Sequence, residues 1–220
     1  MGTRTRGKQS IKDWLGMRAV PLHRMVGCIL LLSALTGLSH PAWADPMPWP
    51  VSQQQWRWTR MLRGIATQSG MTVPSLYIFF DPNCPWCSQL WQTRLPDGRF
   101  FKDMPAVWVP VTYLKNDSLG KAAALLRQGS KAALERDLGA AYNPEHRSGG
   151  IEAIEPNQAE LSDLGHSKAV WLQLGGATPM FVYRSSSGQV LRYLGLPKDP
   201  AMLMDILRSA VPPRLETYRP

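Results

Sequence analysis

Two apolar runs in the first half of the chain predict neighbouring strands. The run at 75–81 is continuous and bounded by Pro74 and Pro82, which is typical of a strand buried on both faces. The run at 106–113 predicts a second strand, and its Pro110 indicates an edge position or a bulge. Because the residues between the two runs read as a helix, we expect the strands to pair in parallel.

Two shorter apolar runs later in the chain predict a hairpin. They cover 180–184 and 189–194, and the turn residues Ser186-Ser187-Gly188 lie between them. A short connection of this kind makes its two strands antiparallel. Together with the parallel pair, the hairpin predicts a mixed sheet.

Apolar residues at helical spacing lie between these strands. The predicted helices cover 53–67, 117–126, 130–138, 157–174 and 199–210. A further helix begins at Pro85 and runs to the breaker Pro96-Asp97-Gly98, whereas 147–155 reads as a loop. Gly165 marks a point where the helix at 157–174 bends or breaks. The order of elements predicts an α/β fold with helices on both faces of the sheet.

The first 44 residues read as an export signal and not as part of the fold. Basic residues up to Arg24 precede an uncharged apolar run at 25–38, and Ala42-Trp43-Ala44 supplies small residues around a cleavage site. The apolar run is shorter than the roughly 20 helical residues that span a bilayer, so a retained membrane anchor is the weaker alternative. Met17 begins a signal of ordinary shape and is a candidate for the true start. We therefore expect export to the periplasm.

The predicted signal carries more than half of the chain's net positive charge. Residues 1–44 hold six of the 25 basic residues and one of the 16 acidic ones, so without them the formal charge falls from +9 to +4. The high isoelectric point is then no indication of a nucleic-acid partner. About 176 residues remain, enough for one domain and too few for two of ordinary size.

The exported part keeps two cysteines, Cys84 and Cys87, at C-x-x-C spacing. A disulfide between them closes too small a ring to stabilise the fold much, so the pair indicates redox chemistry. Pro85 fits the first turn of a helix, which places Cys84 at the helix start and Cys87 one turn in. A helix start favours a thiolate. We therefore predict that Cys84 attacks and Cys87 resolves, and we expect Cys84 to be exposed.

Other readings of the pair can be compared. A zinc site needs four ligands, and the exported part adds only His146 and His166, which are 20 residues apart. Haem attachment requires a histidine after the second cysteine, where this chain has Ser88. A cysteine protease would not need a second cysteine. Two reduced cysteines packed as small hydrophobic residues remain an alternative, and we expect no metal or other cofactor.

Several stretches of the sequence resemble one known family. The stretches are Phe80-Asp81-Pro82-Asn83-Cys84-Pro85-Trp86-Cys87, Gln89-Leu90-Trp91, Gly176-Ala177-Thr178-Pro179 and Gly195-Leu196-Pro197. Together they are similar to the bacterial periplasmic thiol:disulfide interchange proteins of the DsbC/DsbG type, and nearest to the DsbG branch. The similarity covers about 72–210 and is weakest through 115–156, which reads as a helical insertion.

The resemblance implies a thioredoxin-like domain at 72–212. We expect it to follow an N-terminal segment with a short helix at 45–71 and to precede a tail at 213–220. The family has an N-terminal dimerisation domain and a linker helix, for which 45–71 is too short, so we expect a monomer.

The resemblance also assigns roles around the cysteines. It implies that Thr178 and a cis Pro179 face Cys84 and hold an extended substrate segment through main-chain hydrogen bonds. Pro85 and Trp86 form the dipeptide between the cysteines, where Trp86 departs from the small or tyrosine residue usual in the family.

The leading functional hypothesis is an oxidoreductase that reduces or rearranges disulfides in protein substrates. A redox partner in the membrane or periplasm would recycle the cysteine pair. The same residues would serve an oxidant that donates disulfides, and only a redox potential separates the two. A chaperone-like or assembly-accessory module that uses the thioredoxin groove without turnover is the alternative, although the two intact cysteines argue against it.

Overall fold

The computed structural model describes residues 47–71 and 74–210. The chain divides into two units, Met1–Ala44 and Asp45–Pro220, and all described residues belong to the second. The predicted export signal, its alternative start at Met17 and the predicted tail at 213–220 lie outside the described residues. In the part that is described, no helix has both the length and the apolar character needed to cross a membrane.

The described strands form one mixed sheet in the order β1-β6-β5-β3-β4-β2. The strands are β1 (Trp49–Pro50), β2 (Ile65–Ala66), β3 (Leu76–Phe80), β4 (Val107–Pro110), β5 (Met180–Arg184) and β6 (Val190–Leu194). The pair β3 and β4 is parallel, and β5 and β6 form the antiparallel hairpin. Both pairings were predicted from the sequence and are confirmed. β3 also pairs with β5 in the antiparallel direction, which brings the hairpin beside the first predicted strand.

The central strand β3 is buried on both faces, as its continuous apolar sequence predicts. Leu76, Ile78 and Phe80 pack into one hydrophobic cluster, and Tyr77 and Phe79 pack into another. Successive side chains of a strand point to opposite faces, so each cluster lies on its own side of the sheet. Such a strand needs cover from helices on both sides.

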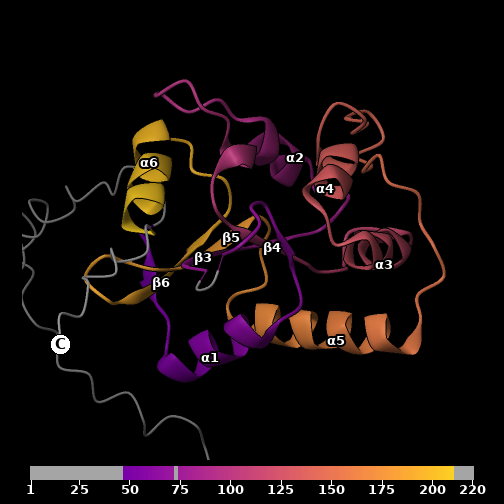
Figure 1. Cartoon of the computed structure of the whole chain (residues 1–220), viewed down its shortest axis with the longest axis horizontal. Helices are drawn as coiled ribbons and strands as arrows, with labels where there is room; N and C mark the ends of the chain where they lie inside the picture. Colours follow the sequence, from indigo (N-terminus) through magenta and orange to yellow (C-terminus); the bar gives the residue numbers. More distant parts are fainter. Residues whose placement is uncertain (1–46, 72–73, 211–220) are drawn as a thin grey trace, which may run out of the picture. The chain divides into compact units, whose positions relative to one another are not determined.

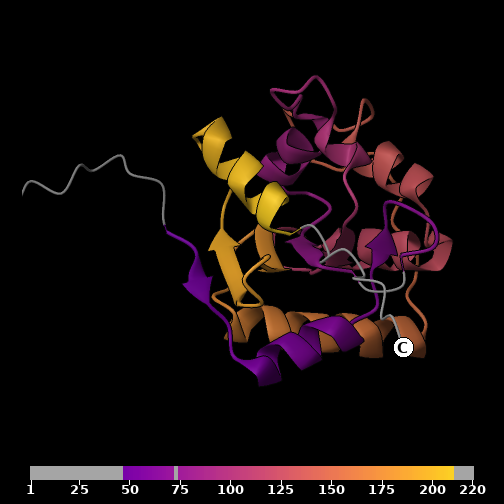
Figure 2. The same ribbon diagram turned by 60° about the vertical axis from the view of Figure 1, so that its left-hand side comes forward.

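Two groups of helices provide that cover. The helices are α1 (Gln53–Met61), α2 (Pro85–Gln92), α3 (Ser118–Gln128), α4 (Lys131–Leu138), α5 (Gln158–Gln173) and α6 (Pro200–Ser209), with a short 3₁₀ helix at Phe101–Asp103. Helices α1 and α5 run side by side on one face of the sheet, and α2, α4 and α6 lie on the other (Figure 1). The view in Figure 2 shows α1 and α5 along the same face. The predicted layers are confirmed.

Helix α1 is shorter than the pattern of apolar residues predicts. It begins with a capping box between Ser52 and Gln55 and ends at Met61, whereas the sequence predicted a helix to residue 67. Ile65 instead belongs to β2, pairs opposite Trp108 and is fully buried. The prediction was wrong here because a two-residue strand has no periodicity of its own, and only its pairing with β4 makes it extended.

Pro110 does not lie on an edge strand, although the sequence indicated an edge or a bulge. β4 has β3 on one side and β2 on the other. The Val111 N–H donates to the Phe80 oxygen of β3 at 2.8 Å, so position 110 faces the other side. β2 pairs only with Val107 and Trp108, and it has ended before Pro110. On the side where Pro110 lacks an N–H there is no neighbouring strand, so the sheet loses no hydrogen bond.

Helix α5 is continuous, contrary to the expected bend or break at Gly165. Its capping box between Asn157 and Glu160 starts a helix that runs unbroken through Gly165 to Gln173. An isolated glycine lowers helix stability by only about 1 kcal/mol, which packing on α1 and α3 can outweigh. After the helix, Gly175 and Gly176 both have positive φ angles, a conformation that favours glycine and turns the chain towards β5.

Candidate active site at the cysteine pair

The cysteine pair lies where the central strand leads into α2. Cys84 is the N-cap residue of α2, Pro85 occupies the first helical turn, and Cys87 follows within it. The Cys84 N–H donates to the backbone carbonyl oxygen of Asp81 at 2.9 Å, and the Cys84 carbonyl accepts from the N–H groups of Cys87 and Ser88 at 3.1 Å each. The predicted position of Cys84 at a helix start is confirmed.

Both cysteines are buried, so the expected exposure of Cys84 is wrong. Cys84 is 1% exposed and Cys87 is fully buried, whereas Trp86 between them is 57% exposed. Burial of Cys84 has a tertiary cause, because its sulfur lies 3.6 Å from the carbonyl oxygen of Thr178. The loop that carries Thr178 thus packs against the thiol, and the two sulfurs are not bonded to each other.

The environments of the two cysteines shift their pKa values in opposite directions. A hydrogen bond from Cys87 lowers the pKa of Cys84 to about 7, against the effect of burial and with help from the Thr178 side chain and the backbone N–H groups of Cys87 and Trp86. Burial, followed by the hydrogen bond and charge of Cys84, raises the pKa of Cys87 well above its ordinary value. Near neutral pH, Cys84 is therefore the sulfur that can become a thiolate.

The structure brings Thr178 and Pro179 against the pair. The bond between them is cis, as the resemblance implies, and both residues are buried. The Pro179 carbonyl accepts from the Gly195 N–H at 2.8 Å, so the turn after β6 anchors the loop. All the residues named in advance as site residues, from Cys84 to Cys87 and at 178–179, thus meet at one end of the sheet.

Asp81 organises the loop before Cys84, and sequence reasoning assigned it no role. One carboxylate oxygen accepts from the Asn83 N–H at 2.8 Å and the Ser118 hydroxyl at 2.9 Å. The other accepts from the backbone N–H groups of Tyr113 and Leu114 at 2.8 and 3.1 Å. This buried carboxylate ties the cysteine loop to the segment after β4. Its position directly after a buried strand was the available signal.

A second set of contacts supports the same loop from the insertion. The Lys121 ammonium donates to the side-chain oxygen of Asn83 at 3.2 Å and to the carbonyl oxygen of Gly149 at 2.8 Å, and it pairs with Asp117 at 3.1 Å. The Tyr142 hydroxyl donates to the Asn83 carbonyl at 3.0 Å. The insertion at 115–156 therefore has a structural task at the site, which its weak family pattern concealed.

Comparison with known proteins identifies the architecture. A periplasmic thioredoxin-like protein from Salmonella enterica serovar Typhimurium superposes with a TM-score of 0.51 at 13% identity, over 73% of this chain and 97% of that protein. The chain has a thioredoxin-like fold. No family model matches the sequence.

A curated relative of this thioredoxin-fold protein is the thiol:disulfide interchange protein DsbG of Pseudomonas aeruginosa. The two are 25% identical over 166 residues, which is 72% of this chain and 60% of the relative. This chain therefore spans about three fifths of the relative's length. The resemblance to DsbC/DsbG-type proteins, and to DsbG in particular, is confirmed.

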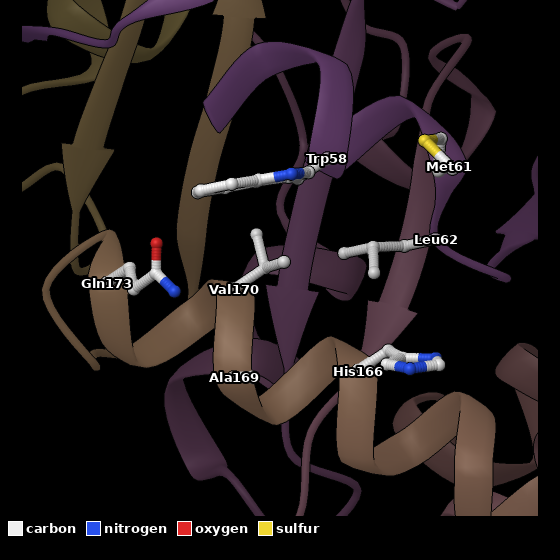
Figure 3. Close-up of a pocket in the computed structure, with 7 residues that line it drawn as sticks. All are labelled: Trp58, Met61, Leu62, His166, Ala169, Val170 and Gln173. Carbon is white, nitrogen blue, oxygen red and sulfur yellow. The ribbon is translucent and has the colours of Figure 1, made fainter. Parts of the chain in front are cut away.

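The thioredoxin-like domain also has an apolar surface groove between α1 and α5. The groove has a volume of about 330 Å³. The side chains of Trp58 and Leu62 extend over α5 above Val170, and His166 lies beside them on α5 (Figure 3). The lining residues include neither cysteine and only one ionisable side chain, that of His166. The groove thus lacks the chemistry of the cysteine site.

The described part of the chain brings no set of metal-binding side chains together. Across 47–71 and 74–210 there is no cluster of three or more histidine, cysteine or acidic side chains that could hold a metal ion. His146 lies in the loop after α4, whereas His166 lies on α5. The chemistry that the described site offers is that of two thiols with unequal pKa values.

Proposed function

We propose that the protein is a periplasmic thiol:disulfide oxidoreductase that reduces or rearranges disulfides in protein substrates through Cys84 and Cys87. One observation carries the proposal. Cys84 is the N-cap residue of α2, its sulfur lies against the Thr178 loop, and its pKa falls to about 7 while that of Cys87 rises. A pair of structural cysteines has no need of such asymmetry. The similarity to DsbG supports the same reading.

The proposed reaction proceeds in two exchanges. The Cys84 thiolate attacks one sulfur of a substrate disulfide, the substrate bond breaks, and the departing thiolate takes up a proton. Cys87 then loses its proton and attacks the Cys84 sulfur, which releases the second substrate thiol and closes the Cys84–Cys87 disulfide. The substrate gains two electrons from the pair and two protons, one of them from solvent, and a redox partner must later supply two electrons to reduce the Cys84–Cys87 disulfide again.

The fall in the Cys84 pKa also bears on the direction of electron flow. Thioredoxin, a reductant, has an attacking cysteine with a pKa of about 7, whereas the strong oxidant DsbA has one near 3.5. A pKa of about 7 for Cys84 favours reduction or rearrangement over donation of disulfides. Equilibration with glutathione tests this, because a potential near −120 mV belongs to an oxidant and one near −270 mV to a reductant.

Substrate binding belongs to the loop beside the sulfur. We assign Thr178 and Pro179 to holding an extended substrate segment by main-chain hydrogen bonds, as in β-strand addition. Exposed apolar side chains border this place: Trp86 between the cysteines, with Tyr113 and Leu114 after β4. Such a border fits an unfolded or extended protein with apolar residues near its disulfide.

Oligomeric state is a further part of the proposal. β1, α1 and β2 all lie before residue 72, yet β1 and β2 pair with the sheet and α1 covers one of its faces. This segment is thus used inside the thioredoxin-like domain, which supports a monomer. Sedimentation of the exported chain tests it, and a stable dimer at micromolar concentration would contradict it.

The decisive experiment is reduction of insulin with dithiothreitol as electron source. The wild-type protein should accelerate precipitation of the insulin B chain, and Cys84→Ser should not. Ser130→Ala is a matched control, because it removes only the side-chain cap of α4. Activity in Cys84→Ser equal to wild type would overturn the enzyme proposal, and it would favour a binding module without turnover.

A further inference from the structure

Tyr113 reaches the active site from the segment after β4. Its hydroxyl lies 2.7 Å from the Thr178 hydroxyl, and either oxygen can donate. The backbone of Tyr113 is fixed independently, because its N–H donates to Asp81 at 2.8 Å. The same carboxylate holds the loop before Cys84. Tyr113 and the attacking cysteine are therefore held by one common group.

The ring of Tyr113 is fixed as well as its backbone. It packs on Trp171 with ring centroids 4.8 Å apart and an interplanar angle of 33°. Trp171 is nearly fully buried and donates from its indole nitrogen to the Ala177 carbonyl at 2.7 Å. Ala177 directly precedes Thr178. Trp171, which positions the Tyr113 ring, is therefore hydrogen-bonded to the same loop that the Tyr113 hydroxyl contacts.

The direction of the hydrogen bond decides what Thr178 can do for Cys84. A hydroxyl has one proton, so Thr178 cannot donate to Tyr113 and to the Cys84 sulfur at the same time. If Tyr113 donates to Thr178, the threonine proton is not taken up by the phenol and is free to act on the Cys84 sulfur, which lies 3.6 Å from the carbonyl oxygen of the same residue. Burial, its largest influence, raises the pKa of Tyr113 to about 12, so the phenol keeps its proton throughout the range in which Cys84 ionises.

We propose that Tyr113 is a positioning residue that donates to the Thr178 hydroxyl and thereby turns the threonine proton towards the Cys84 thiolate. The inference rests on the proposed function only in naming Cys84 as the attacking sulfur. It adds a link that the cysteine pair and the cis-proline loop do not themselves contain: phenol to threonine hydroxyl to thiolate. Chains of hydrogen bonds strengthen one another, so a group without direct contact can still stabilise the charge.

Other groups also act on the cysteine pair and must be held constant in a test. Three of them lie in loops: Asp81 after β3, Tyr113 after β4 and Tyr142 after α4. The fourth is Lys121 of α3, which acts through Asn83. Tyr142 is the useful comparison. Its hydroxyl donates to the Asn83 carbonyl and has no hydrogen bond to Thr178. Removing that hydroxyl is the same chemical change beside the same pair, but outside the proposed chain.

The test measures ionisation of Cys84 directly through its rate of alkylation by iodoacetamide between pH 5 and 9. In Tyr113→Phe, which keeps the ring on Trp171, the rate at pH 6 should fall about 3-fold, the size expected for loss of a modest hydrogen bond. At pH 9, where the thiol is ionised in either protein, the rates should agree. Agreement at high pH separates a change in ionisation from a change in access.

A double-substitution comparison locates the effect in Thr178. Thr178→Val should slow alkylation at pH 6 by itself, and adding Tyr113→Phe should then change nothing further. In Thr178→Ser, which keeps a hydroxyl, Tyr113→Phe should again lower the rate about 3-fold. Tyr142→Phe, which removes a hydroxyl that supports the loop before Cys84 but does not contact Thr178, should lower the rate at pH 6 by clearly less than Tyr113→Phe does.

Three results would overturn the inference: an unchanged rate in Tyr113→Phe, an equal loss in Tyr142→Phe, or a full additional loss in the Thr178→Val background. Alkylation needs no substrate protein, so the outcome is independent of turnover. A 3-fold fall in Tyr113→Phe in a protein that fails to reduce insulin would support the hydrogen-bond chain while contradicting the proposed function.

Discussion

The Thr178 carbonyl oxygen lies 3.6 Å from the Cys84 sulfur, although 94 residues separate them in the chain. This contact closes the site, because it covers a thiol that the helix start alone would leave open. Covering the sulfur also removes it from water, which disfavours the thiolate. For Cys84, the hydrogen bond from Cys87, with smaller contributions from the Thr178 side chain and from nearby backbone N–H groups, outweighs burial. For Cys87, burial prevails.

Selective alkylation should follow from this difference. At pH 6, about one tenth of Cys84 is a thiolate at a pKa of about 7, whereas Cys87, with its raised pKa, has far less. Because both sulfurs are buried, the preference arises from ionisation and not from access. Mass spectrometry of partly labelled protein should find Cys84 modified first. Equal labelling would contradict the assigned roles.

Trapping of substrates should distinguish the two cysteines in the opposite way. Cys87→Ser leaves the attacking thiolate but removes the thiol that resolves the mixed disulfide, so covalent complexes should accumulate. Cys84→Ser should form none. Non-reducing electrophoresis followed by reduction measures both. Complexes formed by Cys84→Ser at the level of Cys87→Ser would mean that Cys87 can attack by itself.

Asp81→Asn should destabilise the protein by about 3 kcal/mol, because an amide cannot accept from four donors as the carboxylate does. Urea unfolding followed by tryptophan fluorescence measures the change. Asp163→Asn is the matched control, since Asp163 pairs with Arg63 in a solvent-accessible ion pair worth less than about 1 kcal/mol. Equal losses in the two variants would show that the Asp81 network contributes nothing special.

Asp137 should make stability depend on pH. Its carboxylate is fully buried and makes no hydrogen bond of normal geometry, although the Ile151 N–H faces it, and burial raises its pKa to about 8. In the unfolded chain the pKa is about 3.9, so between pH 4 and 8 the folded state holds a proton that the unfolded state has lost. The free energy of unfolding should therefore fall as pH rises through this window.

Asp137→Asn replaces the neutral acid by a neutral amide and should remove that slope. The free energy of unfolding of the variant minus that of the wild type should be lowest near pH 4. It should increase towards pH 8, by at most about 1.4 kcal/mol per pH unit. Other titrating groups are common to both proteins and cancel in the difference. Urea unfolding at pH 4, 6 and 8 measures it, and a constant difference would refute the raised pKa.

The local features of this protein follow from its sequence because they depend on residues a few positions apart. The continuous apolar run at Leu76–Phe80 predicts a strand covered on both faces, and the hairpin follows from two apolar runs with a short turn. Pro85 after Cys84 predicts the helix start and the order of attack. The family pattern placed Thr178 and Pro179, which spacing alone could not do.

Tertiary structure decided the features that depend on distant segments. Ile65 became part of a strand because β4 offered it a partner, and Cys84 became buried because the Thr178 loop packs on it. The four donors to Asp81 come from its own loop, from the segment after β4 and from α3. No local sequence pattern predicts them. A sequence pattern reports which face a residue turns inward. It does not report which backbone N–H, hydroxyl or carbonyl of a distant segment contacts the buried side chain. At this site those groups set the ionisation of the Cys84 thiol.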